Sequence, residues 1–170
     1  MFDIVKRLFE ICLFKKGPQD LPYRLSVLKM AVAANMLVSF LMLHMDKGGL
    51  RSVLQTVVGI ALEVFFAGLC LYSFGKLARF WQTASALLGT DALLSFFALP
   101  VMATLILQQG GVAVFLVMVA IIIWHWAVVG HILRHALDKH ISFSLGLALL
   151  YLVASYKVMA LLFPELPSVN

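Results

Sequence analysis

Five stretches of the chain are apolar over a length that suits a membrane span. They lie at about residues 25–43, 53–72, 84–108 or 92–108, 112–133 and 141–163. The run from Val112 to Leu133 is the clearest, because it contains no Lys, Arg, Asp or Glu. A helix of roughly 20 apolar residues crosses a hydrocarbon core of about 30 Å. The pattern predicts an all-α, polytopic membrane protein whose residues 25–163 form a bundle of five transmembrane helices.

The first 17 residues follow a different pattern. On a helix, Asp3, Lys6, Arg7 and Glu10 fall on one face, and Phe2, Val5, Leu8, Phe9 and Cys12 fall on the other. This pattern is typical of an amphipathic helix that lies in the membrane interface. We therefore expect residues 1–17 to form an interfacial helix, with a mobile cytosolic tail as the alternative. The recurring charges leave no continuous apolar run for a cleavable signal peptide.

The third apolar stretch has two interpretations. Residues 74–91 either begin a long span or lie along the interface as a second amphipathic helix. The interfacial interpretation is favoured, with Thr90 or Asp91 as the N-cap of a span over residues 92–108. Pro100 is then expected to kink this span.

Composition agrees with a membrane protein, and charge placement predicts its orientation. Of the 170 residues, 63% are hydrophobic and 12% are charged, which lies outside the usual range of soluble domains. Five spans place Lys47 and Arg51 on one side and a larger basic set on the other, while Lys29 and Lys157 fall within spans. That set is Lys6, Arg7, Lys15, Lys16, Arg24, Lys76, Arg79, Arg134 and Lys139. We expect a multi-pass protein of the cell inner membrane with the N-terminus in the cytoplasm and the C-terminus outside. The net charge of +5 is explained by topology and predicts no nucleic-acid partner.

Glu63 is the most costly residue to place, because it lies near the middle of the second span. An ionised carboxylate at the bilayer centre is unfavourable by a few kcal/mol, so it should face the bundle, be protonated or be paired. A structural pair with Lys157 or His125 is favoured, and a proton relay is the alternative. Asp91 is either a helix cap, which is favoured, or a second intramembrane acid.

Histidines of the fourth span could suggest a haem or metal site. His131 and His135 lie about 40° apart on one helix face, whereas His125 points elsewhere. One helix cannot hold a haem from both sides, and no acid or cysteine completes a metal ligand set. We therefore expect no cofactor and no metal, and interpret Cys12 and Cys70 as small buried side chains.

The segment from Leu69 to Pro100, together with the predicted topology, resembles the Yip-type five-span membrane protein family in its small bacterial members. The aligned positions are Gly75, Gln82, Gly89 and Pro100. The resemblance implies a non-enzymatic integral membrane protein that acts through partners.

The favoured function is that of an accessory or scaffold subunit of a larger membrane assembly, in contact with lipid and with other transmembrane subunits. Catalytic motifs such as GxSxG, HExxH or a P-loop are missing from the sequence, which predicts that the protein is not an enzyme. Short loops leave little room for a gated cavity. One alternative is a proton-coupled small transporter component that uses Glu63 and His125. A second is a haem- or quinone-binding electron carrier that uses His131 and His135.

Overall fold

The structure is a computed structural model that describes residues 2–46, 49–107 and 111–164. Over these residues it contains six α-helices, two short 3-10 helices and no β-strand. They are α1 (Phe2–Cys12), η1 (Pro18–Asp20), α2 (Leu25–Asp46), α3 (Gly49–Ser73), η2 (Leu77–Arg79), α4 (Phe80–Ile106), α5 (Val112–Leu137) and α6 (Ile141–Leu162). In this described part, the five helices α2–α6 are long and apolar enough to cross a membrane, which confirms the predicted all-α class and agrees with five candidate spans.

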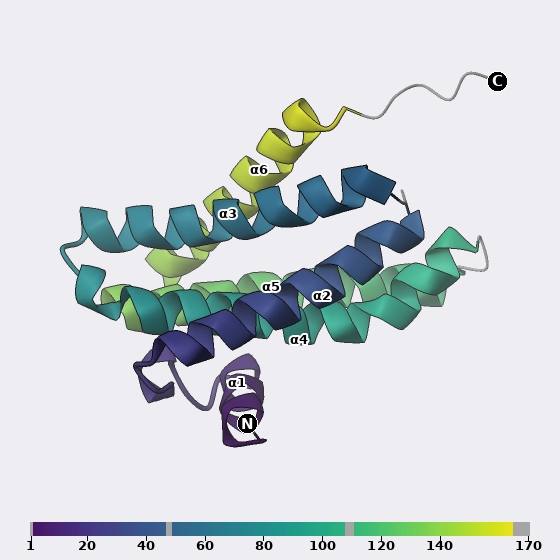
Figure 1. Ribbon diagram of the computed structural model, residues 1–170. Helices are drawn as coiled ribbons and strands as arrows, with labels where there is room; N and C mark the ends of the chain where they lie inside the picture. The colour runs from purple at the N-terminus through teal and green to yellow at the C-terminus, as the bar shows by residue number, and fades with distance from the viewer. Residues whose placement is uncertain (1, 47–48, 108–110, 165–170) are drawn as a thin grey trace.

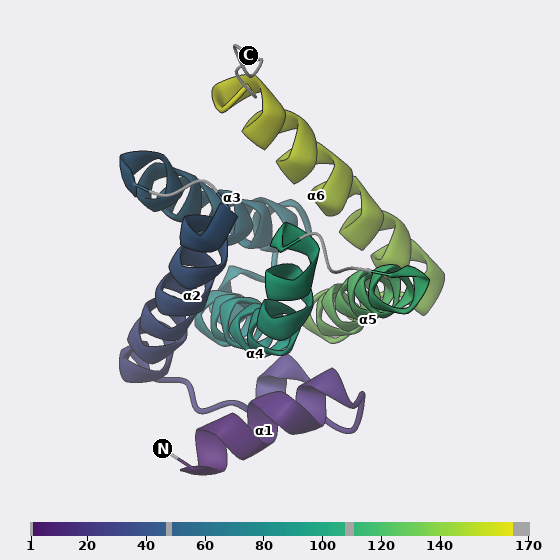
Figure 2. The same cartoon turned by 90° about the vertical axis from the view of Figure 1, so that its right-hand side faces the viewer.

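The long helices form a bundle, and α1 packs against the side of this bundle, on α4 and α5. Figure 1 shows α2 to α5 running side by side, whereas α6 starts beside α5 and crosses toward the beginning of α3. The view along the bundle in Figure 2 shows α1 lying across it, next to α4. Arg51 Nη2 donates to the carbonyls of Phe163 and Pro164, each at 2.7 Å, and so ties the end of α6 to α3.

The third span is one uninterrupted helix of 27 residues, α4. The predicted interfacial helix before residue 92 was therefore wrong, and so was the N-cap role of Asp91, which lies inside α4. The physical reason is burial. Every residue from Thr83 to Thr90 is buried, whereas an interfacial helix would keep one face exposed. Neighbouring helices cover this part of α4, and Pro100 also lies inside the helix.

One face of α1 is packed into the bundle. Leu8, Ile11 and Cys12 are buried and belong to the main hydrophobic core. Gly89 of α4 makes room for this contact, because a Cβ there would come within 2.7 Å of the Leu8 methyl groups. The indole Nε1 of Trp124 in α5 donates to the carbonyl of Cys12 at 2.9 Å. The N-terminal helix is thus held by protein contacts on this face.

A second apolar face of α1 is free of the bundle. It consists of the exposed side chains Phe2, Val5, Phe9 and Leu13. The predicted apolar face is therefore divided in two, since Leu8 and Cys12 contact protein while Phe2, Val5 and Phe9 point outward. A helix with one protein face, one apolar outer face and one charged face suits the rim of a bundle at a lipid–water boundary.

A network of ionic contacts joins two connections at the end of the bundle near η2. Asp138 caps the end of α5 in the left-handed conformation, with φ 52°. Its carboxylate pairs with Lys76 and, at 2.9 Å, with Arg79. Arg79 Nη1 also donates to the carbonyls of His135 and Ala136, at 3.1 and 3.2 Å. These two cations lower the pKa of Asp138 to about 2.

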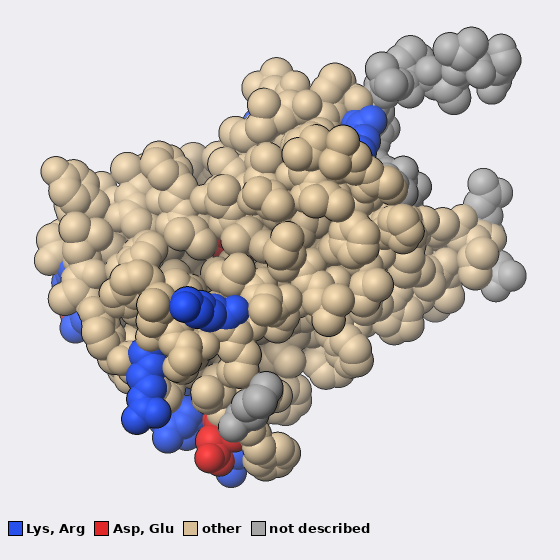
Figure 3. Space-filling view, viewed as in Figure 1, with Lys and Arg blue, Asp and Glu red and all other residues tan. Residues whose placement is uncertain are grey.

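We call this end, which carries η1, η2 and Asp138, the charged end, and the opposite end the far end. Figure 3 shows most of the visible Lys and Arg side chains gathered near α1 and at the charged end, with a broad uncharged belt beside them. The belt is what a membrane-spanning bundle requires. Lys47, on which the far side of the charge count partly depends, lies outside the described residues.

Candidate functional site

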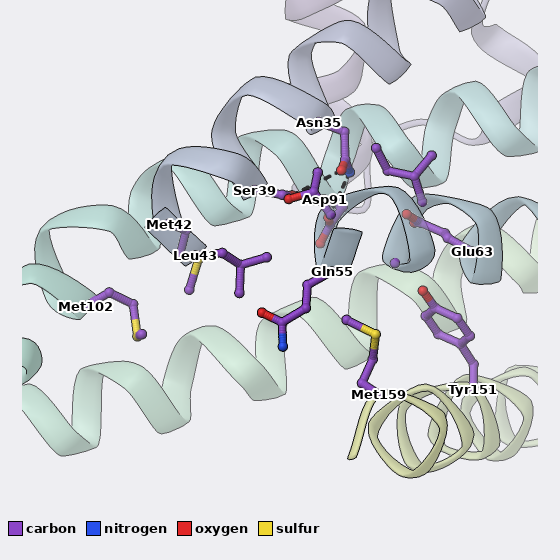
Figure 4. A pocket seen from close by; sticks show the side chains of 13 residues that line it. Asn35, Ser39, Met42, Leu43, Gln55, Glu63, Asp91, Met102, Tyr151 and Met159 are labelled. Carbon is purple, nitrogen blue, oxygen red and sulfur yellow. Dashed lines mark hydrogen bonds between the residues drawn. The ribbon is translucent and has the colours of Figure 1, made fainter. Parts of the chain in front are cut away.

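A cavity of about 250 Å³ lies among α2, α3, α4 and α6. It is lined by Asn35, Ser39, Met42, Leu43, Gln55, Thr56, Gly59, Ile60, Glu63, Asp91, Met102, Tyr151 and Met159. Several of these residues come from the parts of their helices near the far end (Figure 4). In Figure 3 an acidic side chain is visible at the bottom of a recess in the uncharged face. The bundle therefore contains a cavity despite its short loops.

Asp91 is the centre of a hydrogen-bonded group at the inner end of the cavity. Asn35 Nδ2 donates to Asp91 Oδ2 at 2.8 Å and to the carbonyl of Leu88 at 3.1 Å. Ser39 Oγ donates to Asn35 Oδ1 at 3.1 Å. On the other side, His125 Nδ1 lies 3.5 Å from Asp91 Oδ1. The group connects α2, α4 and α5, and it gives the Asp91 carboxyl group polar partners inside the bundle.

Local helix geometry places these groups together. Asn35 and Ser39 are four residues apart, so they lie on the same face of α2 and both reach the cavity. Asn35 is only 2% exposed, and its amide is directed at α4 by the contact with Asp91. The sequence did not single out Asn35. An amide inside an otherwise apolar span is the signal that could have identified it.

Glu63 faces Asp91 from α3. Its side chain is 5% exposed, and Figure 4 shows its carboxyl group pointing toward Asp91. Both carboxyl groups line the same cavity. In the described part of the chain, Glu63 forms no hydrogen bond or ion pair. Glu63 is buried, and the Asp91 side chain is 20% exposed. Ionising both carboxyl groups here is unfavourable unless a cation or a proton compensates the charge.

The predicted partners of Glu63 are placed elsewhere. Lys157 is exposed on α6, and among the described residues it forms no ion pair with Glu63. His125 lies beside Asp91 and not beside Glu63. The residues that α6 contributes to the cavity are Tyr151 and Met159. On a helix, six residues correspond to a rotation of about 240°, so Lys157 and Tyr151 point in different directions.

Gln55 is a further polar residue that the sequence did not indicate. It is 6% exposed, and its Oε1 atom is buried without a hydrogen-bond partner. Figure 4 shows its amide group pointing into the cavity. A buried acceptor without a donor is unfavourable by about 1–3 kcal/mol, so such groups usually mark a missing water, ion or ligand.

His131 and His135 lie away from this cavity, near the charged end. His131 Nε2 is 2.9 Å from the carbonyl of Lys16, and the two imidazole rings touch edge to face with centroids 4.6 Å apart. Among the described residues there is no group of three or more His, Cys, Asp or Glu side chains that could hold a metal ion. The two histidines are placed at the contact between α5 and the linker that follows α1.

Over the described residues, the fold is a helical bundle in which five helices are long and apolar enough to cross a membrane. No family model, curated protein or solved structure matches the chain. The Yip-type resemblance therefore stays a prediction, although its positions have visible structural roles. Gly75 has a positive φ of 66° in the turn after α3, and Gln82 donates to the carbonyl of Leu21 at 2.8 Å. Gly89 admits Leu8 of α1.

Proposed function

We propose that the protein is a multi-pass membrane protein that binds a small solute in its cavity and exchanges it for protons. The observation that carries this proposal is the cavity shared by Glu63 and Asp91, two carboxyl groups from different helices inside an apolar bundle. Carboxyl groups at such depth are expensive, and in membrane proteins they typically bind ions, substrates or protons. This function was an alternative at the level of sequence, and the cavity now favours it.

His125, Asp91 and Glu63 form the proposed proton-binding series across α5, α4 and α3. When the cavity is empty, a proton on one carboxyl group relieves the repulsion between the two acids. A bound cation would relieve it equally well, so solute and proton compete for the same negative charge. Competition of this kind is the simplest physical basis for exchange. Tyr151 of α6 is the remaining titratable group at the cavity, and α2 supplies only the neutral Asn35 and Ser39.

Infrared spectroscopy of the purified protein tests the exchange without knowledge of the solute. Protonated carboxyl groups absorb separately from ionised ones, and a pH titration follows their interconversion. We expect a carboxyl band that Glu63→Gln and Asp91→Asn each change, while Glu10→Gln on α1 leaves it unaltered. In vesicles that enclose a pH-sensitive dye, the same two variants should take up fewer protons. Spectra and uptake identical in all four proteins would overturn the proposal.

A second candidate is the accessory-subunit role that the sequence favours. The specific observation is the exposure of α6, in which only Ser144 and Ala148 are buried among the described residues. Its outer surface includes Leu149, Leu150 and Val153, all exposed. Another transmembrane subunit could cover this face, and copurification in mild detergent tests for one. A role of this kind requires no titration of Glu63 or Asp91.

The orientation that we propose places the charged end in the cytoplasm and the bundle in the inner membrane. A cysteine at Gly111 should be labelled from outside by an impermeant maleimide, and one at Lys139 should not. The native thiols give a low background, because Cys12 and Cys70 are buried and burial raises the pKa of Cys12 to about 12. Labelling of the Lys139 position alone would reverse the orientation.

A further inference from the structure

The two ends of the cavity have different chemistry. Glu63 and Asp91 lie at one end, and Gln55 lies eight residues before Glu63 on α3. Eight residues of helix rise about 12 Å, so the acids and the amide cannot bind one small ion together. The cavity is therefore suited to an elongated molecule that has different groups at its two ends.

The acidic end calls for one positive charge. If both carboxyl groups are ionised and His125 is protonated, a net charge of −1 is left in the group. Asp91 already accepts a hydrogen bond from Asn35. Glu63 has no partner among the described side chains, and an uncompensated charge at this depth is costly. An ammonium group carries one positive charge and three donors, so it can satisfy both carboxylates.

The wall between the two ends is apolar and adaptable. Met42, Met102 and Met159 line it, together with Leu43 and Ile60. Methionine side chains are flexible and polarizable, and they fit irregular apolar ligands. The volume of about 250 Å³ limits the size of the ligand. Since a cavity of about 150 Å³ holds benzene, this one holds a single ring with a short chain.

The end of the cavity opposite the two acids supplies a hydrogen-bond acceptor that has no donor among the described residues. Gln55 Oε1 is buried, unpartnered and turned into the cavity. A hydroxyl or amino group at the second end of the ligand would satisfy it. This observation is independent of the acidic pair, and it concerns a side chain that is more than nine-tenths buried.

We propose that the solute is a small organic monocation, a primary amine on an apolar body that carries a hydrogen-bond donor at its far end. The ammonium group lies between Glu63 and Asp91, the body lies against the methionines, and the donor reaches Gln55. This inference rests on the proposed function and names the class of solute that the site accepts.

Calorimetric titration of the purified full-length protein with matched probes tests the charge requirement. The probes are 2-phenylethylamine, the neutral 2-phenylethanol and methylammonium, which lacks the apolar body. We expect 2-phenylethylamine to bind at least about ten-fold more tightly than either of the others. Glu63→Gln should remove this preference, and Glu10→Gln should keep it. Equal binding of amine and alcohol, or of amine and methylammonium, would overturn the proposal.

A second comparison tests the other end and does not depend on altering the acids. Tyramine adds a hydroxyl group at the end of the ring opposite to the amine. It should bind the parent protein several-fold more tightly than 2-phenylethylamine does. The two amines should bind the Gln55→Leu variant with equal affinity. An advantage of tyramine that survives in Gln55→Leu would show that Gln55 does not receive the donor.

The two proposals can fail separately. If infrared titration shows proton exchange at Glu63 and Asp91 but none of the amines binds, the solute class is wrong and the proposed function stands. If the amines bind with the expected preferences but the carboxyl bands do not titrate, the site is a cation-binding site without proton exchange.

Discussion

The charged end and the far end of the bundle are built from the same helices but are packed differently. Near the charged end, residues Thr83 to Thr90 of α4 are all buried, and Val128 is the first buried residue of α5. Toward the far end, α5 has no buried residue between Val112 and Ala127. The difference follows from α1 and η1, which cover only one end. Buried side-chain contacts of α4 and α5 are therefore concentrated near the charged end. The cavity lies in the part of the bundle that α1 and η1 do not cover.

The largest effect is expected where α1 enters the core. Leu8→Ala leaves a hole between α1 and Gly89, and it should lower the free energy of unfolding by about 2–5 kcal/mol. Val5→Ala, on the exposed face of the same helix, should change it by less than about 0.5 kcal/mol. Denaturation in mixed micelles measures both. Equal losses would mean that α1 is not anchored by its protein face.

The contact of α5 with α6 should respond next. A Cβ on Gly130 would lie 2.5 Å from Leu145 Cδ2 and 3.3 Å from its Cα, so Gly130→Val forces the helices apart. We expect a loss of about 1–3 kcal/mol. Gly146→Ala is the matched control, because nothing lies within 4 Å of its added Cβ. That variant should be as stable as the parent or slightly more so, since alanine favours a helix.

At the cavity we expect a substitution to raise the free energy of unfolding, in contrast to the two substitutions above. Gln55→Leu removes a buried acceptor that has no partner, and it should raise the free energy of unfolding by about 1 kcal/mol. Gln82→Leu removes an amide that donates to the carbonyl of Leu21, and it should lower stability by a similar amount. Thermal unfolding of the two variants makes the comparison. A loss of stability in Gln55→Leu would mean that the amide is already satisfied in the empty protein.

The smallest effect concerns the ionic contacts of Asp138. Because Lys76 and Arg79 lower its pKa from 3.8 to about 2, its stabilising effect is complete above pH 3.8 and is lost as the pH falls through about 2. Asp138→Asn keeps a residue that tolerates positive φ. The difference in Tm between parent and variant should therefore shrink over that range of pH. Asp3→Asn, at an exposed carboxylate on α1, should show no such trend.

The positions of the helices could be predicted from the sequence more accurately than the contacts between them. Long apolar runs identify α2, α3, α5 and α6 to within a few residues, because length and composition alone decide them. The third span was misjudged because Thr90 and Asp91 look like a helix start. The burial of Thr83 to Thr90 depends on α1, α2 and α5, which come from distant parts of the chain.

The site was predicted in part. Glu63 is identified by its depth, since a carboxylate in mid-span is rare whatever surrounds it. Asp91 has the same depth, but its partners Asn35 and His125 belong to other helices, so its role could not be read locally. Gln55 looks like an ordinary polar residue near the end of a span. Only the packing of four helices shows that it is buried without a partner.

The bond from Trp124 to the carbonyl of Cys12 has a consequence for biosynthesis. The two residues are 112 positions apart, so α1 leaves the ribosome long before the surface that receives it exists. The case of Asp91 is different, because its partner Asn35 precedes it by 56 residues. The hydrogen-bond donor has therefore already been synthesised when Asp91 is made. We expect the N-terminal helix to lack the contact with Trp124 until α5 has been synthesised. A segment that is synthesised well before α5 is therefore among the last to complete its contacts.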